Sequence, residues 1–126
     1  MIRVHTFIKY SRIQLQEAEA ALQEDRPDIC CMRLADLADS LSKALAAALP
    51  TVKKDFTTLE PAAIARHAAD LAEDPKEAQE AAEIIGELRK IREELSDSDS
   101  EVARIAAEKA YSSAGRAFKI IHGFFA

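Results

Sequence analysis

Residues 27–49 read PDICCMRLADLADSLSKALAAAL, and this stretch decides the fold class. Its leucines recur at intervals of three and four residues, which is the spacing that aligns side chains along one face of an α-helix. They are Leu34, Leu37, Leu41, Leu45 and Leu49. Alanine, the strongest helix former, fills many of the positions between them. The stretch therefore predicts a buried helix over residues 28–49, with Pro27 at its start and Pro50 ending it.

Polar residues on this predicted helix follow a stripe of their own. They are Arg33, Asp36, Asp39 and Lys43. Charges three and four positions apart on a helix can pair with one another. We therefore interpret the stripe as a solvated face that carries ion pairs within the helix.

The same helical period appears on both sides of this stretch. Residues 3–24 carry an apolar face at three-and-four spacing. Its positions are Val4, Phe7, Ile8, Ser11, Leu15, Ala18 and Leu22. After a connection, residues 61–73 predict a short helix, and residues 75–95 and 99–126 each predict a long one. The pattern predicts an all-α fold, an antiparallel bundle of four long helices plus one short helix.

Cap residues mark where the later helices begin. Asp74, Pro75 and Glu77 have the order of an N-cap, a proline at the first helical position and a capping-box acid. Ser98 and Glu101 repeat the capping pattern before the last helix. Such signals set helix starts independently of the apolar period.

The composition fits one globular domain over residues 1–126. Apolar residues make up 48% and charged residues 31%, which argues against intrinsic disorder. The formal net charge of −5 argues against a generally basic protein that coats duplex nucleic acid, but it leaves room for a local basic cleft. No apolar run approaches the roughly 18 residues that span a bilayer, so we expect a cytoplasmic protein.

The sequence contains no signature of a metal or cofactor site. Cys30 and Cys31 are neighbours without a CxxC partner, and we interpret them as ordinary semi-buried thiols, with a subunit contact as the alternative. His5, His67 and His122 fall on three different predicted helices, so they do not predict a metal triad. No phosphate-binding or dinucleotide-binding glycine motif is present. We expect no metal and no cofactor.

Arg116 and His122 form the most pointed local arrangement. A histidine can act as general acid or base on a ribose 2′-hydroxyl, and the planar fork of an arginine can hold the scissile phosphate. Their i,i+6 spacing turns them about 240° apart around one helix, so they could meet only across a dimer axis or after fraying. The alternative, which the residues alone favour, is a solvated arginine and a terminal histidine.

Several stretches resemble the HEPN domain family of prokaryotic helical proteins. RPDICCMRLADLADSLSKALAAAL looks like the family's alanine-rich second helix. The matching positions are Ala38, Asp39, Lys43, Ala44 and Leu45. YSRIQLQEAEAALQEDRPD is similar to the opening helix of the family and EVARIAAEKAYSSAGRAFKIIHGFF to its closing helix. ARHAADLAED resembles a mid-domain element, here with His67, Asp70 and Leu71.

The resemblance implies a bundle of four to five helices, commonly a homodimer, that handles nucleotides or RNA. Many family members accompany nucleotidyltransferases in toxin–antitoxin pairs, and many are metal-independent ribonucleases with an arginine, a short spacer and a histidine. Arg116 and His122 meet that spacing. However, Ala117 stands where the family usually has a polar residue, and residues 92–98 lack the Arg-Tyr-Pro signature of some members.

Two functions from different classes follow as expectations. The favoured one is a non-catalytic, dimeric binding module for a nucleotide or RNA, with a small nucleotidyltransferase as its partner. The other is a metal-independent ribonuclease that uses Arg116 and His122, and a helical structural protein without a ligand is a third option. Residues 27–49 have more small apolar positions than one facing helix can cover, and the last helix ends in aromatic residues. Symmetric pairing is the usual outlet for such surplus apolar surface.

Overall fold

The computed structural model describes residues 2–48, 74–94 and 100–125. They form four helices and no strand, which are α1 (Ile2–Gln23), α2 (Pro27–Ala48), α4 (Pro75–Glu94) and α5 (Ser100–Phe124). The predicted all-α fold is confirmed, and the helix bounds lie close to those that the sequence predicts. The short helix predicted over residues 61–73 lies outside the described residues. None of the four described helices is long and apolar enough to cross a membrane.

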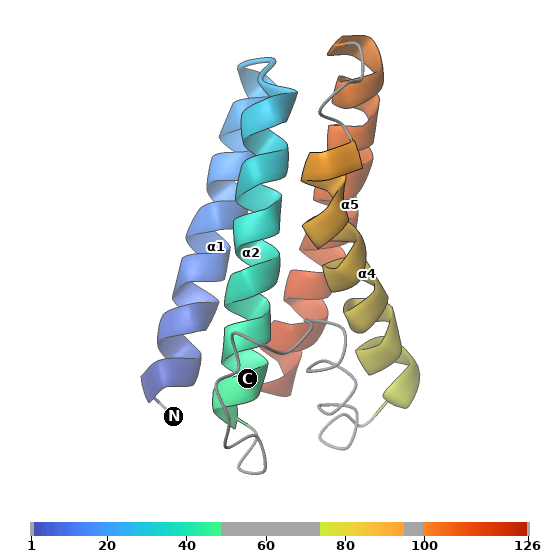
Figure 1. The fold of residues 1–126 in the computed structure, drawn as a ribbon. Coiled ribbons are helices and arrows are strands. Elements are labelled where there is room, and N and C mark those ends of the chain that lie inside the picture. The colour runs from blue at the N-terminus through green and yellow to red at the C-terminus, as the bar shows by residue number, and fades with distance from the viewer. Residues whose placement is uncertain (1, 49–73, 95–99, 126) are drawn as a thin grey trace.

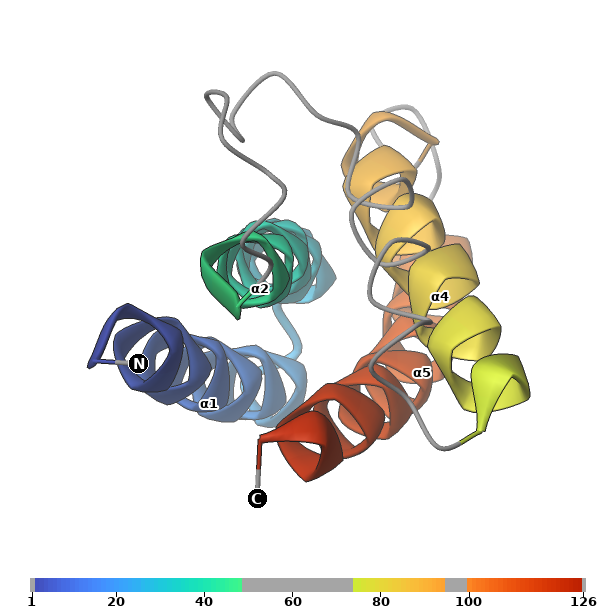
Figure 2. The same cartoon turned by 90° about the horizontal axis from the view of Figure 1, so that it is seen from below.

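The helices alternate in direction along the molecule. In the view of Figure 1, α1 and α4 rise while α2 and α5 descend. α2 contacts α1, α4 and α5, and α5 also contacts α1 and α4. Figure 2 shows α1 and α4 on opposite sides of the molecule. The start of α1 and the end of α5 lie at the same end, which is the bottom in Figure 1.

The apolar face of α2 is the centre of the core. Leu34, Leu37, Leu41 and Leu45 are all 0% exposed. Three helices cover this face rather than the single facing helix that the sequence interpretation assumed. The leucine face of α2 is therefore buried within the chain, while Met32 on the same helix is 43% exposed.

A Schellman motif ends α1, with an aspartate at the position that usually holds glycine. Asp25 has a φ of 59°, in the left-handed region that aspartate tolerates better than most residues. The backbone N–H of Arg26 donates to the carbonyl of Ala21 at 2.8 Å, and that of Asp25 donates to the carbonyl of Leu22 at 3.1 Å. Pro27 then begins α2. This tight link makes α1 and α2 an antiparallel pair.

The predicted N-cap of α4 is confirmed. The backbone N–H of Lys76 donates to Oδ1 of Asp74 at 3.0 Å, which satisfies one of the free donors at the helix start. Pro75 occupies the first helical position. The carboxylate of Glu77, which the sequence assigned to a capping box, lies with Oε1 3.7 Å from Nη2 of Arg116 on α5. Glu77 therefore links two helices.

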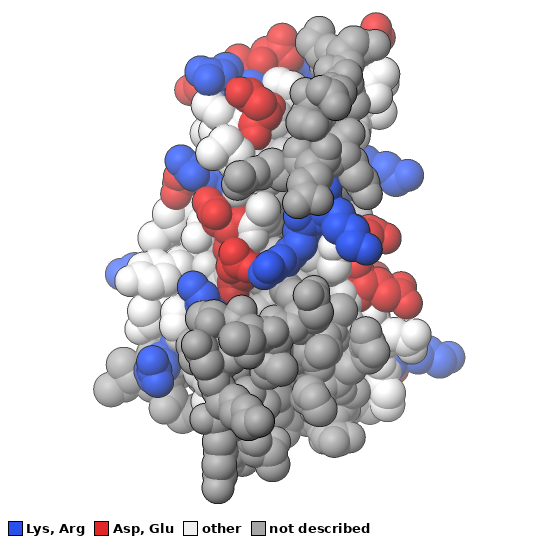
Figure 3. Space-filling model, viewed as in Figure 1, with Lys and Arg blue, Asp and Glu red and all other residues white. Residues whose placement is uncertain are grey.

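The polar stripe of α2 also reaches beyond its own helix. Arg33 Nη1 lies 3.3 Å from Asp36 Oδ2, as the predicted pairing within the helix requires. Its Nε also lies 2.9 Å from Glu17 Oε2 on α1, and Asp39 pairs with Arg89 of α4. Figure 3 shows acidic and basic side chains beside one another over α2 and α4. The stripe thus ties the central helix to both of its neighbours.

Candidate nucleic-acid interface

The acidic residues of the chain are confined to its middle. All 22 Asp and Glu residues lie from Glu17 to Glu108, so neither end of the chain beyond them contains one. The two acid-free segments hold six of the 17 Lys and Arg residues. These six are Arg3, Lys9, Arg12, Lys109, Arg116 and Lys119. Because the start of α1 and the end of α5 lie at the same end of the molecule, the fold brings the two acid-free segments together.

Two side-chain contacts set the register of α1 against α5. The hydroxyl of Tyr111 donates to Oε2 of Glu19 at 3.1 Å. Cζ of Arg12 lies 5.8 Å from the ring centroid of Phe118. On each helix the two contacting residues are seven positions apart, which is about two turns. Both contacts therefore follow the same line between the antiparallel helices.

An arginine and two aromatic rings gather on this line. The rings of Phe118 and His122 are stacked, with centroids 5.7 Å apart and 16° between their planes. Arg12 lies within the range of about 6 Å at which a guanidinium is attracted to an aromatic ring. Arg12 is exposed, and both rings are partly exposed. The cluster therefore offers aromatic surface beside a positive charge.

Helical spacing extends the positive charge along α1. Lys9 and His5 precede Arg12 by one and two turns, so they lie on the same stripe of the helix. Both are exposed. The stripe is thus occupied by a histidine, a lysine and an arginine, with no carboxylate before Gln16. It forms the α1 border of the candidate site.

On α5, Gly115 leaves open space on the surface beside Phe118. Gly115 lies one turn before Phe118, and a methyl group added there would meet nothing within 4 Å beyond its own turn of helix. Lys119 follows Phe118 and is exposed. We call this surface the basic–aromatic face. It consists of His5, Lys9, Arg12, Gly115, Phe118, Lys119 and His122.

Arg116 and His122 lie on different flanks of α5. Arg116 Nε and Nη2 lie 3.1 Å and 3.3 Å from the two carboxylate oxygens of Glu80 on α4, and Nη2 lies 3.7 Å from Glu77. The hydrogen bond to Glu80 is the main cause that raises the pKa of Arg116. His122 instead packs on Phe118. Within the described residues, no hydrogen bond joins Arg116 to His122.

The two flanks of α5 differ in their acidic neighbours. The start of α4 lies at the same end of the molecule and brings Glu77 and Glu80 to one flank of α5. α1 brings only basic and neutral side chains to the other flank at that end. The described carboxylates that pair with α5 at this end therefore lie on its α4 flank, and the basic–aromatic face lies on the flank toward α1.

Sequence reasoning named His122 but missed its surroundings. Arg12 and Lys9 lie outside the apolar positions predicted for residues 3–24, and no local pattern marks them as part of a site. Phe118 belongs to no recognisable sequence motif. Its contact with Arg12 depends on how α5 is aligned against α1, which the sequence does not indicate. The available signal was the order of the charges, because acid-free segments at both ends of the chain would have pointed to a basic end.

The two cysteines of the chain are not reactive thiols. Cys30 and Cys31 are buried rather than semi-buried, at 0% and 3% exposed. Burial raises the pKa of Cys30 to about 12, and it also raises the pKa of Cys31. Both thiols are therefore protonated near neutral pH and are poor nucleophiles. In the ranges that the structure describes, no group of three His, Cys, Asp or Glu residues could hold a metal ion; His67 lies outside those ranges.

Comparison with known proteins yields no relative. No protein-family model, no curated protein and no solved structure matches the chain. The resemblance to the HEPN family therefore rests on the stretches quoted above, and the function is inferred from the chain's own side chains.

Proposed function

We propose that the protein is a non-catalytic, dimeric module that binds single-stranded RNA on the basic–aromatic face. The observation that carries the proposal is the cluster of Arg12, Phe118 and His122, which comes from two segments whose sequences contain no Asp or Glu. Proteins that hold single strands combine a basic surface along the phosphates with aromatic rings that stack on the bases. This face has both components.

The overall charge favours a single strand over a duplex. A duplex would bring many phosphates toward a protein with a net charge of −5, whereas a short single strand can follow one local basic surface. Bases in a duplex are already stacked and cannot reach Phe118, while those of a single strand can. The resemblance to the HEPN family adds RNA as the kind of strand.

The proposed scaffold is the antiparallel bundle of four long helices, completed by the short helix expected over residues 61–73. Its proposed dimer contact is the outer side of α1. Tyr10 and Ile13 are 50% and 41% exposed, and the ring of Phe7 lies edge-on to Tyr10 at 6.4 Å between centroids. From the resemblance we add a small nucleotidyltransferase as a further partner, which co-purification with the candidate enzyme would test.

The alternative function is a metal-independent ribonuclease built on Arg116 and His122. It requires Arg116 to leave Glu80 and approach the histidine of a second chain. Because Arg116 is held by two carboxylates of α4, the geometry favours binding over catalysis.

Fluorescence anisotropy with a labelled single-stranded RNA of mixed sequence tests the binding proposal. The titration is run in EDTA over a series of salt concentrations. We expect affinity to fall with salt, and we expect Lys9→Gln and Arg12→Gln each to reduce the slope of log K against log salt by about 0.7, which corresponds to one lost phosphate contact. Phe118→Leu keeps an apolar side chain but removes the ring, and it should weaken binding by about 1–3 kcal/mol if one base stacks there.

Lys90→Gln is the matched control, because Lys90 is an exposed lysine on α4, away from the face. It should leave both the affinity and the slope unchanged. Equal effects of the control and of Lys9→Gln would mean that only net charge matters. Absence of binding at about 50 mM salt, where electrostatic contacts are strong, would refute the proposal.

A further inference from the structure

A pocket lies between α4 and α5, on the flank of α5 away from the basic–aromatic face. Its volume is about 370 Å³, near the lower end of the range for small-molecule sites. The apolar part of its lining combines Leu88 and Ile91 of α4 with Ala106 and Ala110 of α5. Two alanines opposite two large side chains leave this space open between the helices.

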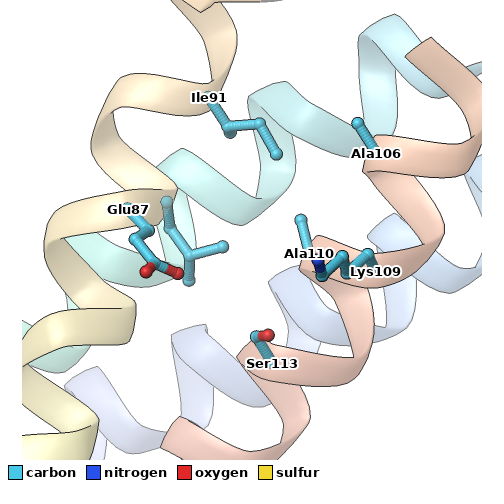
Figure 4. A pocket seen from close by; sticks show the side chains of 7 residues that line it. Glu87, Ile91, Ala106, Lys109, Ala110 and Ser113 are labelled. Atoms are coloured by element: carbon cyan, nitrogen blue, oxygen red, sulfur yellow. The ribbon is translucent and has the colours of Figure 1, made fainter. Parts of the chain in front are cut away.

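The polar part of the lining carries opposite charges on opposite walls. Glu87 comes from α4, and Lys109 and Ser113 come from α5. Figure 4 shows Glu87 and Lys109 directed toward the space between the helices. Both residues are exposed, and neither side chain has an ion pair or hydrogen bond to another residue in the part of the chain that the structure describes. One negative and one positive group are therefore available to a ligand.

We propose that this pocket binds a small zwitterion with an apolar side chain, namely a free α-amino acid such as leucine or phenylalanine. The ammonium group of the ligand pairs with Glu87 and its carboxylate with Lys109. Its side chain packs against Leu88 and Ile91. The Ser113 hydroxyl can donate a further hydrogen bond to the carboxylate.

The charge pattern selects a zwitterion over singly charged molecules. A ligand with only an amine, or only a carboxylate, would make one charge-assisted contact instead of two. Charge-assisted hydrogen bonds at both ends also fix the orientation of the ligand. The volume suits a molecule of amino-acid size.

The test is an NMR titration of the full-length, ¹⁵N-labelled protein with L-phenylalanine and L-leucine. We expect saturable shifts of the backbone amides around Glu87–Ile91 and Ala106–Ser113. Phenethylamine lacks the carboxylate and 3-phenylpropanoate lacks the ammonium group, and each should bind at least about tenfold more weakly, the loss expected for one charge-assisted contact.

Variants of the two walls separate a built site from a packing gap. Glu87→Gln and Lys109→Gln should each weaken binding about tenfold, while Glu83→Gln, one turn earlier on α4 and outside the lining, should not. Ala106→Leu should fill the pocket and abolish the saturable shifts. Because Glu87 is exposed, its variant tests the site even if the leucine variant fails to fold. No saturable shifts, equal binding of the singly charged analogues, or an unchanged affinity of Glu87→Gln would each overturn the proposal.

Discussion

Arg116 of α5 and Glu80 of α4 are joined by two nitrogen–oxygen contacts, 3.1 Å from Nε to Oε1 and 3.3 Å from Nη2 to Oε2. The planar guanidinium fork matches the carboxylate, and Glu77 adds a second negative charge on the same side. Two carboxylates beside one guanidinium leave little positive potential for a phosphate. This pairing separates Arg116 from the basic–aromatic face, although both lie on the same helix.

We therefore predict that Arg116→Gln leaves the affinity for single-stranded RNA unchanged, whereas Arg12→Gln weakens it. Anisotropy titrations of the two variants at the same salt concentration compare them directly. We also expect no RNA cleavage by the wild type in EDTA. EDTA-resistant cleavage that disappears in both Arg116→Ala and His122→Ala, with the helical circular dichroism intact, would establish the ribonuclease instead. Purifying the variants side by side controls for contaminating nucleases.

Substitutions in the buried face of α2 should lower the unfolding free energy more than loss of the N-cap of α4. Leu41 and Leu45 are 0% exposed, so either residue changed to alanine should cost about 2–5 kcal/mol of unfolding free energy. Asp74→Ala removes one N-cap hydrogen bond and should cost about 0.5–2 kcal/mol. Urea unfolding followed by circular dichroism measures both. A cap variant that is less stable than the leucine variants would contradict this placement of the core.

Local signals account for what the sequence predicts well. The spacing of Leu41 and Leu45 fixes a buried helix face whatever packs on it, and Asp74 caps its helix through atoms two residues away. Contacts between helices are not local. The sequence predicts only that Arg33 pairs within α2. In the structure it also pairs with Glu17, because the tight link at Asp25 folds α1 back onto α2.

The candidate site shows the same division. His122 was identified from its chemistry together with Arg116, which the i,i+6 spacing places on a different side of the same helix. Its actual neighbour is Phe118, one turn away, and Arg12 is brought there from the other end of the chain. No periodicity within one helix can indicate which flank faces a carboxylate and which does not, because that depends on the packing of α4 and α1 on either side of α5.

Gly115→Ala should stabilise the protein. Gly115 lies in the interior of α5, where glycine is about 0.5–1 kcal/mol less favourable than alanine. An added methyl group has room, since nothing lies within 4 Å of its position beyond its own helical turn. Thermal unfolding measures the gain. Gly123→Ala, in the last turn of the same helix, is the control and should gain less because helix ends fray. Destabilisation by Gly115→Ala would show that the gap is filled.

The buried thiols predict a loss of stability at alkaline pH. An unfolded cysteine ionises near its ordinary pKa of 9.0, while burial raises the pKa of Cys30 to about 12 in the folded chain. The unfolded state then binds fewer protons, so stability is complete below pH 9.0 and falls as pH rises toward 12. The limiting slope for one thiol is about 1.4 kcal/mol per pH unit.

Urea unfolding at a series of alkaline pH values measures how steeply the unfolding free energy falls with pH, and Cys30→Ala should reduce that slope. It should not abolish it, because burial also raises the pKa of Cys31, and burial with the hydrogen bond to Glu19 raises that of Tyr111. At neutral pH neither native thiol should react with a disulfide reagent until the protein is unfolded. Rapid labelling of the folded protein would show that the thiols are accessible.

The outer side of α1 should form the dimer contact. Gln14 hydrogen-bonds with Ser40 of α2, and Tyr10 lies one turn before Gln14 on the same flank. Tyr10 and Ile13 are nonetheless 50% and 41% exposed. Large apolar side chains that stay exposed side by side are typical of a surface that another protein covers. Tyr10 lies on the far side of α1 from Arg12, whereas Ile13 follows Lys9 by one turn. A second copy packed on Tyr10 and Ile13 would therefore leave Arg12 open to RNA and would border Lys9.

Light scattering at micromolar concentration should therefore report twice the chain mass of 13.8 kDa. Ile13→Glu places a charge in the proposed contact, where pairing would bury it without a partner, and it should yield a monomer that keeps its helical signal. Ile105→Glu is the matched control, because Ile105 is 61% exposed on α5 and lies outside the contact. A monomeric wild type would refute the dimer itself. If Ile13→Glu left the dimer intact and Ile105→Glu disrupted it, the contact would lie at the start of α5 instead of on α1. The added carboxylate would then meet the same desolvation cost there.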